Sequence, residues 1–290
     1  MMISTPVSGV WTLNLADIVL DPLCGKTVRL WFDLGCVQIS SISHPTIVAR
    51  RLNKVGGVIR QGNRWFLSEY AIGYSIFEYA NQSALKHSRP TQVHWLGSTP
   101  HFDGTDNAVC EHDLLFYSSS SQRLYAMRLQ PSTSSRRLRS ISFPPLKRTI
   151  KVSGAKSQAL YAHSYSLIDL ESGGGYIWAL YRDDTFLKVI KIECATLGIA
   201  GQWSLRHVHP KRVVNAFIAC DFLYTVTQSS DSNVLSVVYD FESDIYVEPS
   251  KEVGSWKRHG IPSNVQYDPL SRTINVFDNG LIYTIDTKQT

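Results

Sequence analysis

Short strand-like segments recur along this chain, separated by turn residues about every ten residues from near residue 45 onward. No helical period of 3.6 residues lasts for more than a turn or two. This rhythm is typical of all-β sandwiches and propellers, and no linker interrupts it, so one β domain is expected. The expected strands are Leu114–Tyr117, Arg123–Leu129, Leu138–Phe143, Tyr176–Tyr181, Phe186–Ile192, Val214–Ile218, Phe222–Val226, Val234–Tyr239, Ile245–Val247, Thr273–Phe277 and Leu281–Ile285.

The length of the strand-rich region favours a propeller over a sandwich. Four such strands with their turns use about 45 residues, so roughly 240 residues supply about five blades. A sandwich of this length would need two domains and a visible joint. Hairpin turns are expected at Gly173–Gly175, Asp183–Asp184 and Asp278–Gly280, because Gly, Asn and Asp tolerate positive φ. The fold predicted from these features is an all-β, five-bladed β-propeller.

Composition narrows the class of partner. Only 18% of the 290 residues are charged and 11% are aromatic, which suits a β-rich globular protein. The net charge of +5 is small and scattered, so no nucleic acid partner is expected. Ser134–Arg139 with Lys147, Arg148 and Lys151 forms a local basic cluster, which is either the solvated face of outer strands or a site for an acidic glycan or protein.

The first 23 residues do not form a clear targeting segment. No Lys or Arg precedes the apolar stretch, and Asp17 and Asp21 interrupt it, so neither a standard signal peptide nor a membrane span is expected. An unusual signal, a start further upstream and a cytosolic protein remain as alternatives. Asn81 begins an N-glycosylation sequon, Asn81–Ser83, which matters only in a secreted chain.

The five cysteines show no spacing typical of a zinc site. The odd count allows at most two disulfides and does not decide the compartment. One cysteine, Cys220, lies in the apolar run Val213–Val226 together with Asn215. A buried Asn amide needs hydrogen-bond or ion partners, so this run is expected to anchor a site as well as the fold.

The sequence resembles the olfactomedin domain family. The resemblance rests on motifs in the family's order and spacing, and it covers about residues 36–288, whereas residues 1–35 form an extension without a recognisable counterpart. These motifs are Tyr165–Leu170, Tyr176–Tyr181, Asn215–Cys220 with Leu223 and Tyr224, Val265–Leu270 and Phe277–Gly280, and, more weakly, Cys36 with His44 and Pro45, Gly57–Val58, and Gly104–Asp106 with Val109.

The resemblance implies a propeller closed by one disulfide, between Cys36 and Cys220. In the chain-entropy model, closing a loop of well over 100 residues contributes about 4–5 kcal/mol. Two free buried thiols are the alternative. Cys24, Cys110 and Cys194 are then expected to remain as core or half-buried thiols.

The resemblance also implies a calcium ion in the central channel. Its ligands would be Asp169, Asn215, the backbone carbonyls of Ala216 and Val265, and the side chain of Gln266. The family has an Asp at position 266, so the neutral amide should weaken the site. In one reading the Gln266 amide oxygen binds calcium weakly; in the other a monovalent cation or water replaces calcium, and an amide nitrogen of Asn215 or Gln266 donates to Asp169.

The function implied is that of a non-enzymatic, secreted or extracellular module that binds other extracellular or cell-surface proteins in matrix adhesion or signalling. The channel positions supply one carboxylate, whereas a glycosidase needs two, so no enzymatic activity is expected. The alternative is a glycosidase-like propeller hydrolase with an unrecognised site. A second carboxylate near Asp169 would favour it. A third interpretation is that the chain is an intracellular fragment of such a protein.

Four tryptophans are candidates for contact residues if they are exposed: Trp65, Trp95, Trp203 and Trp256.

Overall fold

The computed structural model describes residues 37–289, apart from 97–99, 130–145, 152–158 and 183–184. Within these residues nearly all regular structure is β-strand. One short α-helix, α1 (Gln82–Lys86), and one 3-10 turn at Pro210–Arg212 are the exceptions. The all-β prediction is confirmed.

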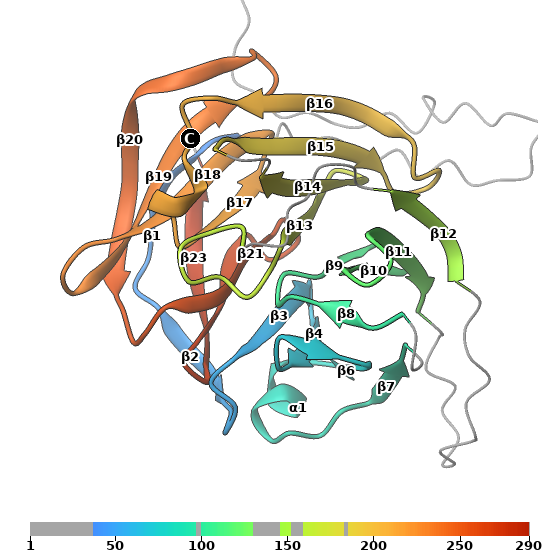
Figure 1. Ribbon diagram of the computed structural model, residues 1–290. Helices are drawn as coiled ribbons and strands as arrows, with labels where there is room; N and C mark the ends of the chain where they lie inside the picture. Colours follow the sequence, from blue (N-terminus) through green and yellow to red (C-terminus); the bar gives the residue numbers. More distant parts are fainter. Residues whose placement is uncertain (1–36, 97–99, 130–145, 152–158, 183–184, 290) are drawn as a thin grey trace, which may run out of the picture. The chain divides into compact units, whose positions relative to one another are not determined.

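Twenty-one of the strands lie in five antiparallel sheets, which are the blades. Each of the first four blades takes four strands in nearly continuous sequence order, as Figure 1 shows. Blade 1 contains β3 (Gly56–Gln61), β4 (Arg64–Glu69), β6 (Ser75–Tyr79) and β7 (Gln92–Trp95); blade 2 contains β9 (Ala108–Cys110), β10 (Asp113–Ser118), β11 (Arg123–Arg128) and β12 (Leu146–Lys151); blade 3 contains β13 (Ile168–Gly173), β14 (Tyr176–Arg182), β15 (Leu187–Glu193) and β16 (Ile199–Leu205); and blade 4 contains β17 (Asn215–Ala219), β18 (Phe222–Gln228), β19 (Ser232–Asp240) and β20 (Ile245–Lys257). A separate two-stranded sheet pairs β5 (Ile72–Gly73) with β8 (Phe102–Asp103).

Blade 5 joins the two ends of the described chain. It contains β21 (Pro262–Asp268), β22 (Thr273–Asp278) and β23 (Leu281–Gln289). Two early strands, β1 (Ile39–Ile42) and β2 (Thr46–Arg50), both pair antiparallel with β23. Since strands from opposite ends of the sequence share one sheet, backbone hydrogen bonds close the ring.

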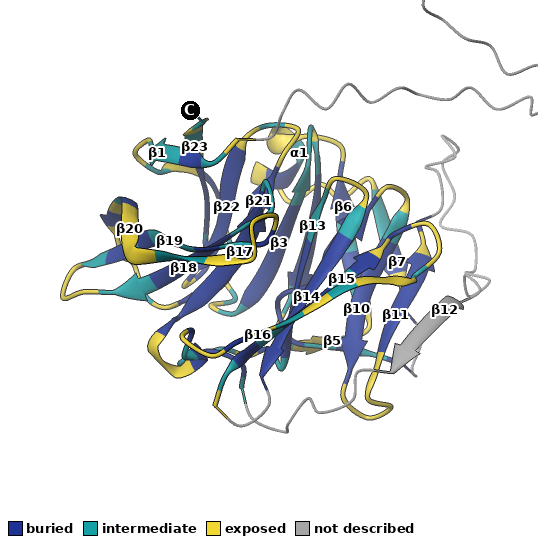
Figure 2. Cartoon of the chain, turned by 90° about the horizontal axis from the view of Figure 1, so that it is seen from above, coloured by how far each residue is buried: buried dark blue, intermediate teal, exposed yellow. Residues whose placement is uncertain are grey.

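Hydrophobic packing follows the same circular order. Along β19 the buried residues alternate strictly with partly exposed ones, as expected of a strand packed on one face. Five hydrophobic clusters each combine side chains from two neighbouring blades. Figure 2 shows this buried interior in dark blue, with exposed residues at the turns. The five blades and five interfaces confirm the five-bladed propeller.

The predicted turns are found where the structure describes them. Gly174 and Gly175 have φ of 59° and 80° between β13 and β14, and Asn279 and Gly280 have φ of 50° and 81° between β22 and β23. These left-handed values explain why Gly and Asn occupy the hairpins. Asp183–Asp184, the strand expected at Leu138–Phe143 and the basic segment Ser134–Arg139 lie outside the described residues.

Two cysteines expected to be free thiols form a disulfide instead. Cys110, at the end of β9, is bonded to Cys194, which follows β15, with their Cα atoms 6.2 Å apart. Both lie in the hydrophobic cluster between blades 2 and 3. The expectation of free thiols was wrong because the fold brings together two positions 84 residues apart in sequence.

The other predicted disulfide is only partly described. Cys220 is disulfide-bonded and lies with Asp221 in the tight turn between β17 and β18, both at positive φ. Its partner in the family pattern, Cys36, lies outside the described residues, as does Cys24. The Cys36–Cys220 pairing therefore stays a prediction.

Asn81, the residue of the glycosylation sequon, caps the short helix α1. Its side-chain oxygen accepts a hydrogen bond from the backbone N–H of Ala84 at 2.9 Å, and the residue is exposed. Its modification stays a prediction. In the described part of the chain no helix is both long and apolar enough to cross a bilayer.

Replacing Cys110 by Ser should lower the free energy of unfolding by about 2–4 kcal/mol, because it removes a crosslink that restricts the unfolded chain. Denaturant titration of the unaltered chain and the variant measures the difference. The double variant Cys110→Ser/Cys194→Ser should match the single variant, because both lack the same bond. Equal unfolding midpoints for the unaltered chain and the variants would contradict a stabilising role.

Candidate functional site

Polar side chains gather where the innermost strands β3, β9, β13, β17 and β21 approach one another. We call this group the axial cluster. Every member is at most 5% exposed, so the group is nearly closed to solvent. Its members are Asp106, Asp169, Glu171, Asn215, Asn264 and Gln266.

Strand geometry explains most of these positions. Successive residues of a strand point to opposite faces, so residues two apart share a face. Asp169 and Glu171 are two apart on β13, and Asn264 and Gln266 are two apart on β21. Asn215 begins β17, the innermost strand of blade 4. The sequence therefore places these side chains along the propeller axis.

Asp106 reaches the cluster from the segment that precedes β9. The Ser166 hydroxyl accepts hydrogen bonds from the backbone N–H groups of Thr105 (2.8 Å) and Asp106 (3.2 Å). The Thr105 hydroxyl donates to the carbonyl of Ser263. These bonds connect the segment to blades 3 and 5.

A glycine permits the close approach of blade 1. A Cβ atom added to Gly57 would lie 1.9 Å from the carbonyl oxygen of Thr105. No side chain fits in that space. Gly57 therefore allows β3 to pack directly against the segment that carries Asp106.

Asn264 links Asp106 to the backbone of β3. Its amide nitrogen donates to Asp106 Oδ1 at 2.9 Å, while its amide oxygen accepts from the N–H of Val58 at 2.9 Å. Burial nevertheless raises the pKa of the Asp106 carboxyl to about 6, and hydrogen bonds from Ser166 and Asn264 only partly offset this effect.

Asp169 and Glu171 form a coupled pair of buried acids. Burial raises the pKa of each carboxyl well above its usual range, and the nearby negative charges raise it further. Tyr161 donates its hydroxyl hydrogen to Asp169 Oδ2 at 2.6 Å. None of the interactions that shift the pKa values of Asp106, Asp169 and Glu171 comes from Lys, Arg or His.

Three oxygens of the axial cluster are buried without a donor group among the described residues, although the carboxyls of Asp169 and Glu171 can hydrogen-bond each other when one of them is protonated. They are Asp169 Oδ1, Glu171 Oε1 and Asn215 Oδ1. A buried polar atom left unpaired is costly, and a buried carboxylate without a counter-charge is more costly still. The carboxyl groups must therefore retain protons or bind a cation.

Gln266 is fixed by its amide nitrogen rather than by its oxygen. This nitrogen donates to the backbone carbonyls of Asn107 (2.5 Å) and Leu170 (2.8 Å). Two carbonyl acceptors require the nitrogen on that side of the amide. The donor to Asp169 is Tyr161, a residue that sequence reasoning missed, and not the amide of Asn215 or Gln266.

The five residues predicted to hold calcium do lie on innermost strands. Asp169 is on β13, Asn215 and Ala216 are on β17, and Val265 and Gln266 are on β21. The strands β13, β17 and β21 contact one another. Within the described residues, no group of three or more His, Cys, Asp or Glu side chains is arranged to hold a metal ion. Free oxygens of one carboxylate and one amide nonetheless match the hard donors that calcium prefers.

The axial cluster contains three carboxylates, whereas the sequence analysis expected one. Asp106 and Glu171 were missed, although Glu171 has the two-residue spacing from Asp169 that places both on one face. Glu171 lies close enough to Asp169 to interact with it, so the criterion set for a hydrolase, a second carboxylate near Asp169, is met. All three acids are at most 2% exposed, however, and a glycosidase must bring two carboxyl groups to a substrate bond.

These features define a five-bladed β-propeller with buried acidic and amide side chains on its axis. Residues 33–290 match the family model of the olfactomedin-like domain. The chain belongs to the olfactomedin-like family, and the resemblance stated from its motifs is confirmed.

Similar proteins agree with this assignment. Myocilin of Rattus norvegicus is 24% identical over 79% of this chain and 44% of its own length. Olfactomedin-like protein 3B of Danio rerio is 21% identical over 91% of this chain and 66% of its own length. The chain thus spans about half the length of the myocilins that it matches. The crystal structure of Myxococcus xanthus glutaminyl cyclase, with 12% identity and a TM-score of 0.50 over 88% of this chain and 97% of its own, shares the fold alone.

The buried acids predict how stability depends on pH when a chelator removes metal ions. Each pKa is higher in the folded than in the unfolded state, so the folded state holds protons more tightly and loses stability as pH rises above about 4. For Asp106 this loss occurs between about pH 4 and 6, and for Asp169 and Glu171 it continues to higher pH. The shift of Asp106 alone corresponds to a decrease of roughly 3 kcal/mol. Denaturant titrations at several pH values measure this decrease.

Asp106→Asn is the matched variant, because it removes the titrating group and keeps an oxygen that can accept from Asn264. Its free energy of unfolding should fall less over the same pH range. An equal fall in the unaltered chain and in Asp106→Asn would show that Asp106 does not contribute.

Proposed function

We propose that this chain is a non-enzymatic extracellular module that binds another extracellular or cell-surface protein, with a role in adhesion or signalling. Membership in the olfactomedin-like family supports this function. The Cys110–Cys194 disulfide supports an extracellular location, because disulfides persist in oxidising compartments. The near-complete burial of the axial carboxylates argues against a role in substrate turnover.

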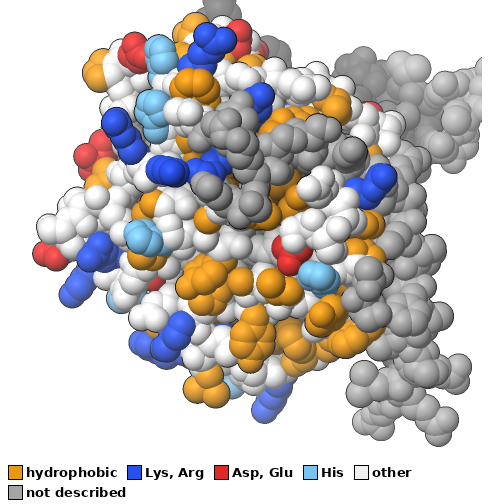
Figure 3. All heavy atoms as spheres, viewed as in Figure 1, with side chains coloured by type: hydrophobic (Ala, Val, Ile, Leu, Met, Phe, Trp, Pro, Cys, Tyr) orange, Lys and Arg blue, Asp and Glu red, His pale blue; other side chains and the backbone are white. Residues whose placement is uncertain are grey.

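The observation that carries the proposal is an exposed group of large apolar side chains on blade 1 and the adjoining strand β5. We call it the aromatic surface, and it consists of Tyr70, Ile72, Tyr74 and Trp95. Their exposed fractions are 59%, 59%, 43% and 40%. The rings of Tyr74 and Trp95 stack with centroids 6.3 Å apart, and His101 meets the Tyr74 ring edge-on at 5.6 Å. Figure 3 shows hydrophobic side chains gathered on the lower part of this face, over the region that contains β6, β7 and β8 in Figure 1.

Trp95 is the most suitable contact residue among the four tryptophans considered from the sequence. Trp65 and Trp256 are buried, with exposed fractions of 1% and 3%. Trp203 is partly buried and packs against Trp178 and Phe241. Contiguous exposed aromatic groups typically mark interaction sites, and tryptophan and tyrosine dominate the binding energy of many protein interfaces.

A photo-crosslinking amino acid, p-benzoylphenylalanine, placed at position 95 should capture the partner on cells that bind the full chain. The matched control places it at position 270, because Leu270 is 60% exposed in the turn between β21 and β22, away from the aromatic surface. Mass spectrometry identifies the captured proteins. We expect a protein that is captured from position 95 and not from position 270.

Competition separates specific capture from chance contact. Unlabelled unaltered chain should block the crosslink, whereas Trp95→Ser should need an at least tenfold higher concentration, since loss of a hot-spot residue costs about 2 kcal/mol or more. Equal competition by both chains, or the same proteins captured from both positions, would contradict the proposal.

We also propose that the axial cluster binds calcium, with Glu171 taking the place of the missing second Asp. Asp169 and Asn215 would supply their unpaired side-chain oxygens, and Ala216 and Val265 their backbone carbonyls. Gln266 would help to hold the site, because its amide nitrogen is anchored by the carbonyls of Asn107 and Leu170. The support for this assignment is the set of three unpaired buried oxygens on Asp169, Glu171 and Asn215.

Millimolar calcium should raise the thermal unfolding midpoint of the unaltered chain relative to chelator, because a ligand that binds only the folded state stabilises it. Glu171→Gln should reduce this rise, since calcium affinity increases with the number of carboxylates. In chelator the same variant should be more stable than the unaltered chain near pH 7, because it removes a buried acid. Differential scanning fluorimetry measures both effects.

Asp231→Asn is the control for this experiment, because Asp231 is an exposed acid outside the axial cluster. Its response to calcium should equal that of the unaltered chain. If calcium raises the midpoints of the unaltered chain and Glu171→Gln equally, the proposed role of Glu171 is wrong. No calcium effect on any chain would refute the site.

A further inference from the structure

A pocket of about 620 Å³ opens at the end of the propeller where the innermost strands begin. Lys54 and Val55 precede β3, His163 and Tyr165 precede β13, and Ile261 precedes β21. The next residues inward, such as Ser166 and Ser263, hold the segment that carries Asp106. The pocket therefore lies next to the axial cluster, and its volume is typical of ligand sites.

The pocket carries positive charge without a matching negative charge. Among the described residues that line it are the cations Lys54 and Arg258, and none of the lining residues is acidic. The Lys54 ammonium donates a hydrogen bond to the carbonyl of Asn279, at 3.4 Å, and the Arg258 guanidinium donates one to the side-chain oxygen of Gln228, at 3.4 Å. Both contacts are long and involve neutral acceptors, so both cations can accept an anionic partner.

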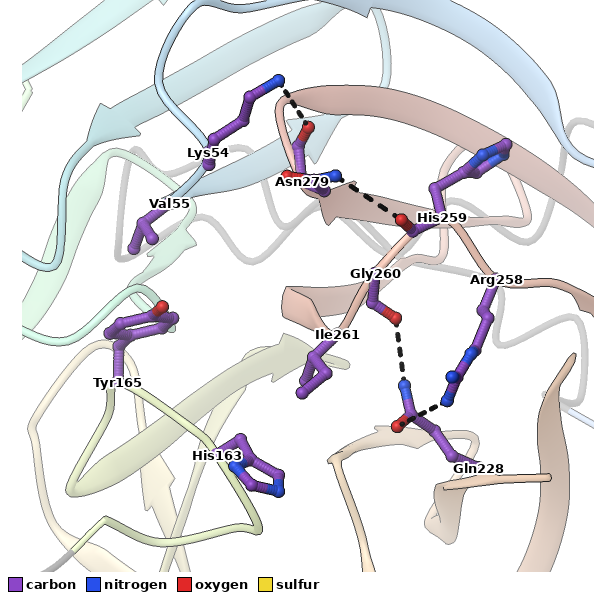
Figure 4. Close-up of a pocket in the computed structure, with 10 residues that line it drawn as sticks. All are labelled: Lys54, Val55, His163, Tyr165, Gln228, Arg258, His259, Gly260, Ile261 and Asn279. Carbon is purple, nitrogen blue, oxygen red and sulfur yellow. Dashed lines mark hydrogen bonds between the residues drawn. The ribbon is translucent and has the colours of Figure 1, made fainter. Parts of the chain in front are cut away.

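Asp278, a nearby carboxylate, does not neutralise the pocket. It lies behind the backbone of the 259–260 segment, accepts a hydrogen bond from the N–H of His259 at 3.1 Å, and is fully buried. Burial also raises the pKa of its carboxyl, which disfavours the negative charge. In Figure 4 the ring of His259 points away from Ile261, whereas Arg258 extends beside Gln228.

Apolar side chains also line the pocket. Val55, Tyr165 and Ile261 line the pocket, and the last two are 49% and 37% exposed. Figure 4 shows Val55 and Tyr165 on the side away from Arg258, with Lys54 next to Val55, and Ile261 in the middle of the view. His163, between these groups in the figure, has φ of 62°, a conformation that residues with side chains rarely adopt and that is enriched at functional sites.

We propose that this pocket binds an acidic peptide segment, with one carboxylate at Lys54, a second carboxylate at Arg258 and an intervening apolar side chain against Tyr165 and Ile261. The mixture of cations and apolar walls fits a peptide better than a sulfated glycan, which would match the charges alone. The proposal deepens the proposed function, on which it rests, by naming the chemistry of the partner. The aromatic surface lies on the same face, since Tyr70 follows β4 where β3 begins, and the N–H of Tyr70 donates to the carbonyl of Val55.

Isothermal titration of the full chain with two capped tripeptides tests the proposal. One peptide contains glutamate, leucine and glutamate; the other contains glutamine, leucine and glutamine. The acidic peptide should bind at least about tenfold more tightly, and less tightly at high salt, because ion pairs at exposed sites are screened. Equal affinity of the two peptides, or binding of only a heparin-derived tetrasaccharide, would overturn the proposal.

Two variants locate the binding site. Lys54→Gln/Arg258→Gln should weaken binding of the acidic peptide about tenfold, whereas Lys251→Gln, on the exposed outer strand β20, should leave it unchanged. If the double variant does not fold, NMR of the unaltered chain decides instead: the peptide should shift the amide signals of Gly260 and Ile261. Unchanged affinity in a folded double variant, or no such shifts, would contradict the proposal.

The peptides are too short to replace a whole partner, so the two proposals can fail separately. If neither peptide binds but Trp95 still governs crosslinking, the pocket proposal is wrong and the interaction module stands. If the acidic peptide binds the pocket but crosslinking does not depend on Trp95, the pocket stands and the aromatic surface does not.

Discussion

Three buried carboxylates on one axis are the constraint on which this propeller depends. Asp106, Asp169 and Glu171 come from neighbouring blades, and none has a Lys, Arg or His partner among the interactions that set its pKa. The hydrophobic interfaces bring the innermost strands together, but they also bring these acids out of water. The fold is stable only if protons or a cation offset that charge. The stability of the whole ring therefore depends on whether the axial carboxylates are protonated or bind a cation.

Closure of the ring stabilises the fold against the free-energy cost of burying these acids. The strands β1 and β2 pair with β23, so the early and late parts of the described chain share blade 5. The Cys110–Cys194 disulfide adds a covalent link between blades 2 and 3. Backbone pairing, five apolar interfaces and a crosslink together hold the acids of the axis at short range. The aromatic surface and the pocket both lie on this closed ring.

The fold could be predicted largely from the sequence, because alternating side chains and turn residues are local signals. The same holds for Asp169, Asn215 and Gln266, which lie in motifs on innermost strands. The Cys110–Cys194 bond could not be predicted from the sequence, since the pairing depends on which blades are neighbours in the ring. The place of Glu171 in the axial cluster could have been predicted, because it lies two residues after Asp169 on the same strand. The place of Asp106 in the axial cluster could not be predicted, because it depends on hydrogen bonds from the backbone of Asp106 to Ser166 and from the Thr105 hydroxyl to blade 5. The exposure of Trp95 likewise depends on packing around the whole ring.

The most direct test of this account is a crystal structure of the chain grown with calcium, with an anomalous difference map to locate the ion. We expect a peak inside the axial cluster, with oxygens of Asp169, Glu171 and Asn215 at about 2.3–2.6 Å from it. Such a peak would explain how three acids share the axis. The account would be contradicted if the axial cluster held no ion at saturating calcium and if Asp169 and Glu171 instead shared a proton.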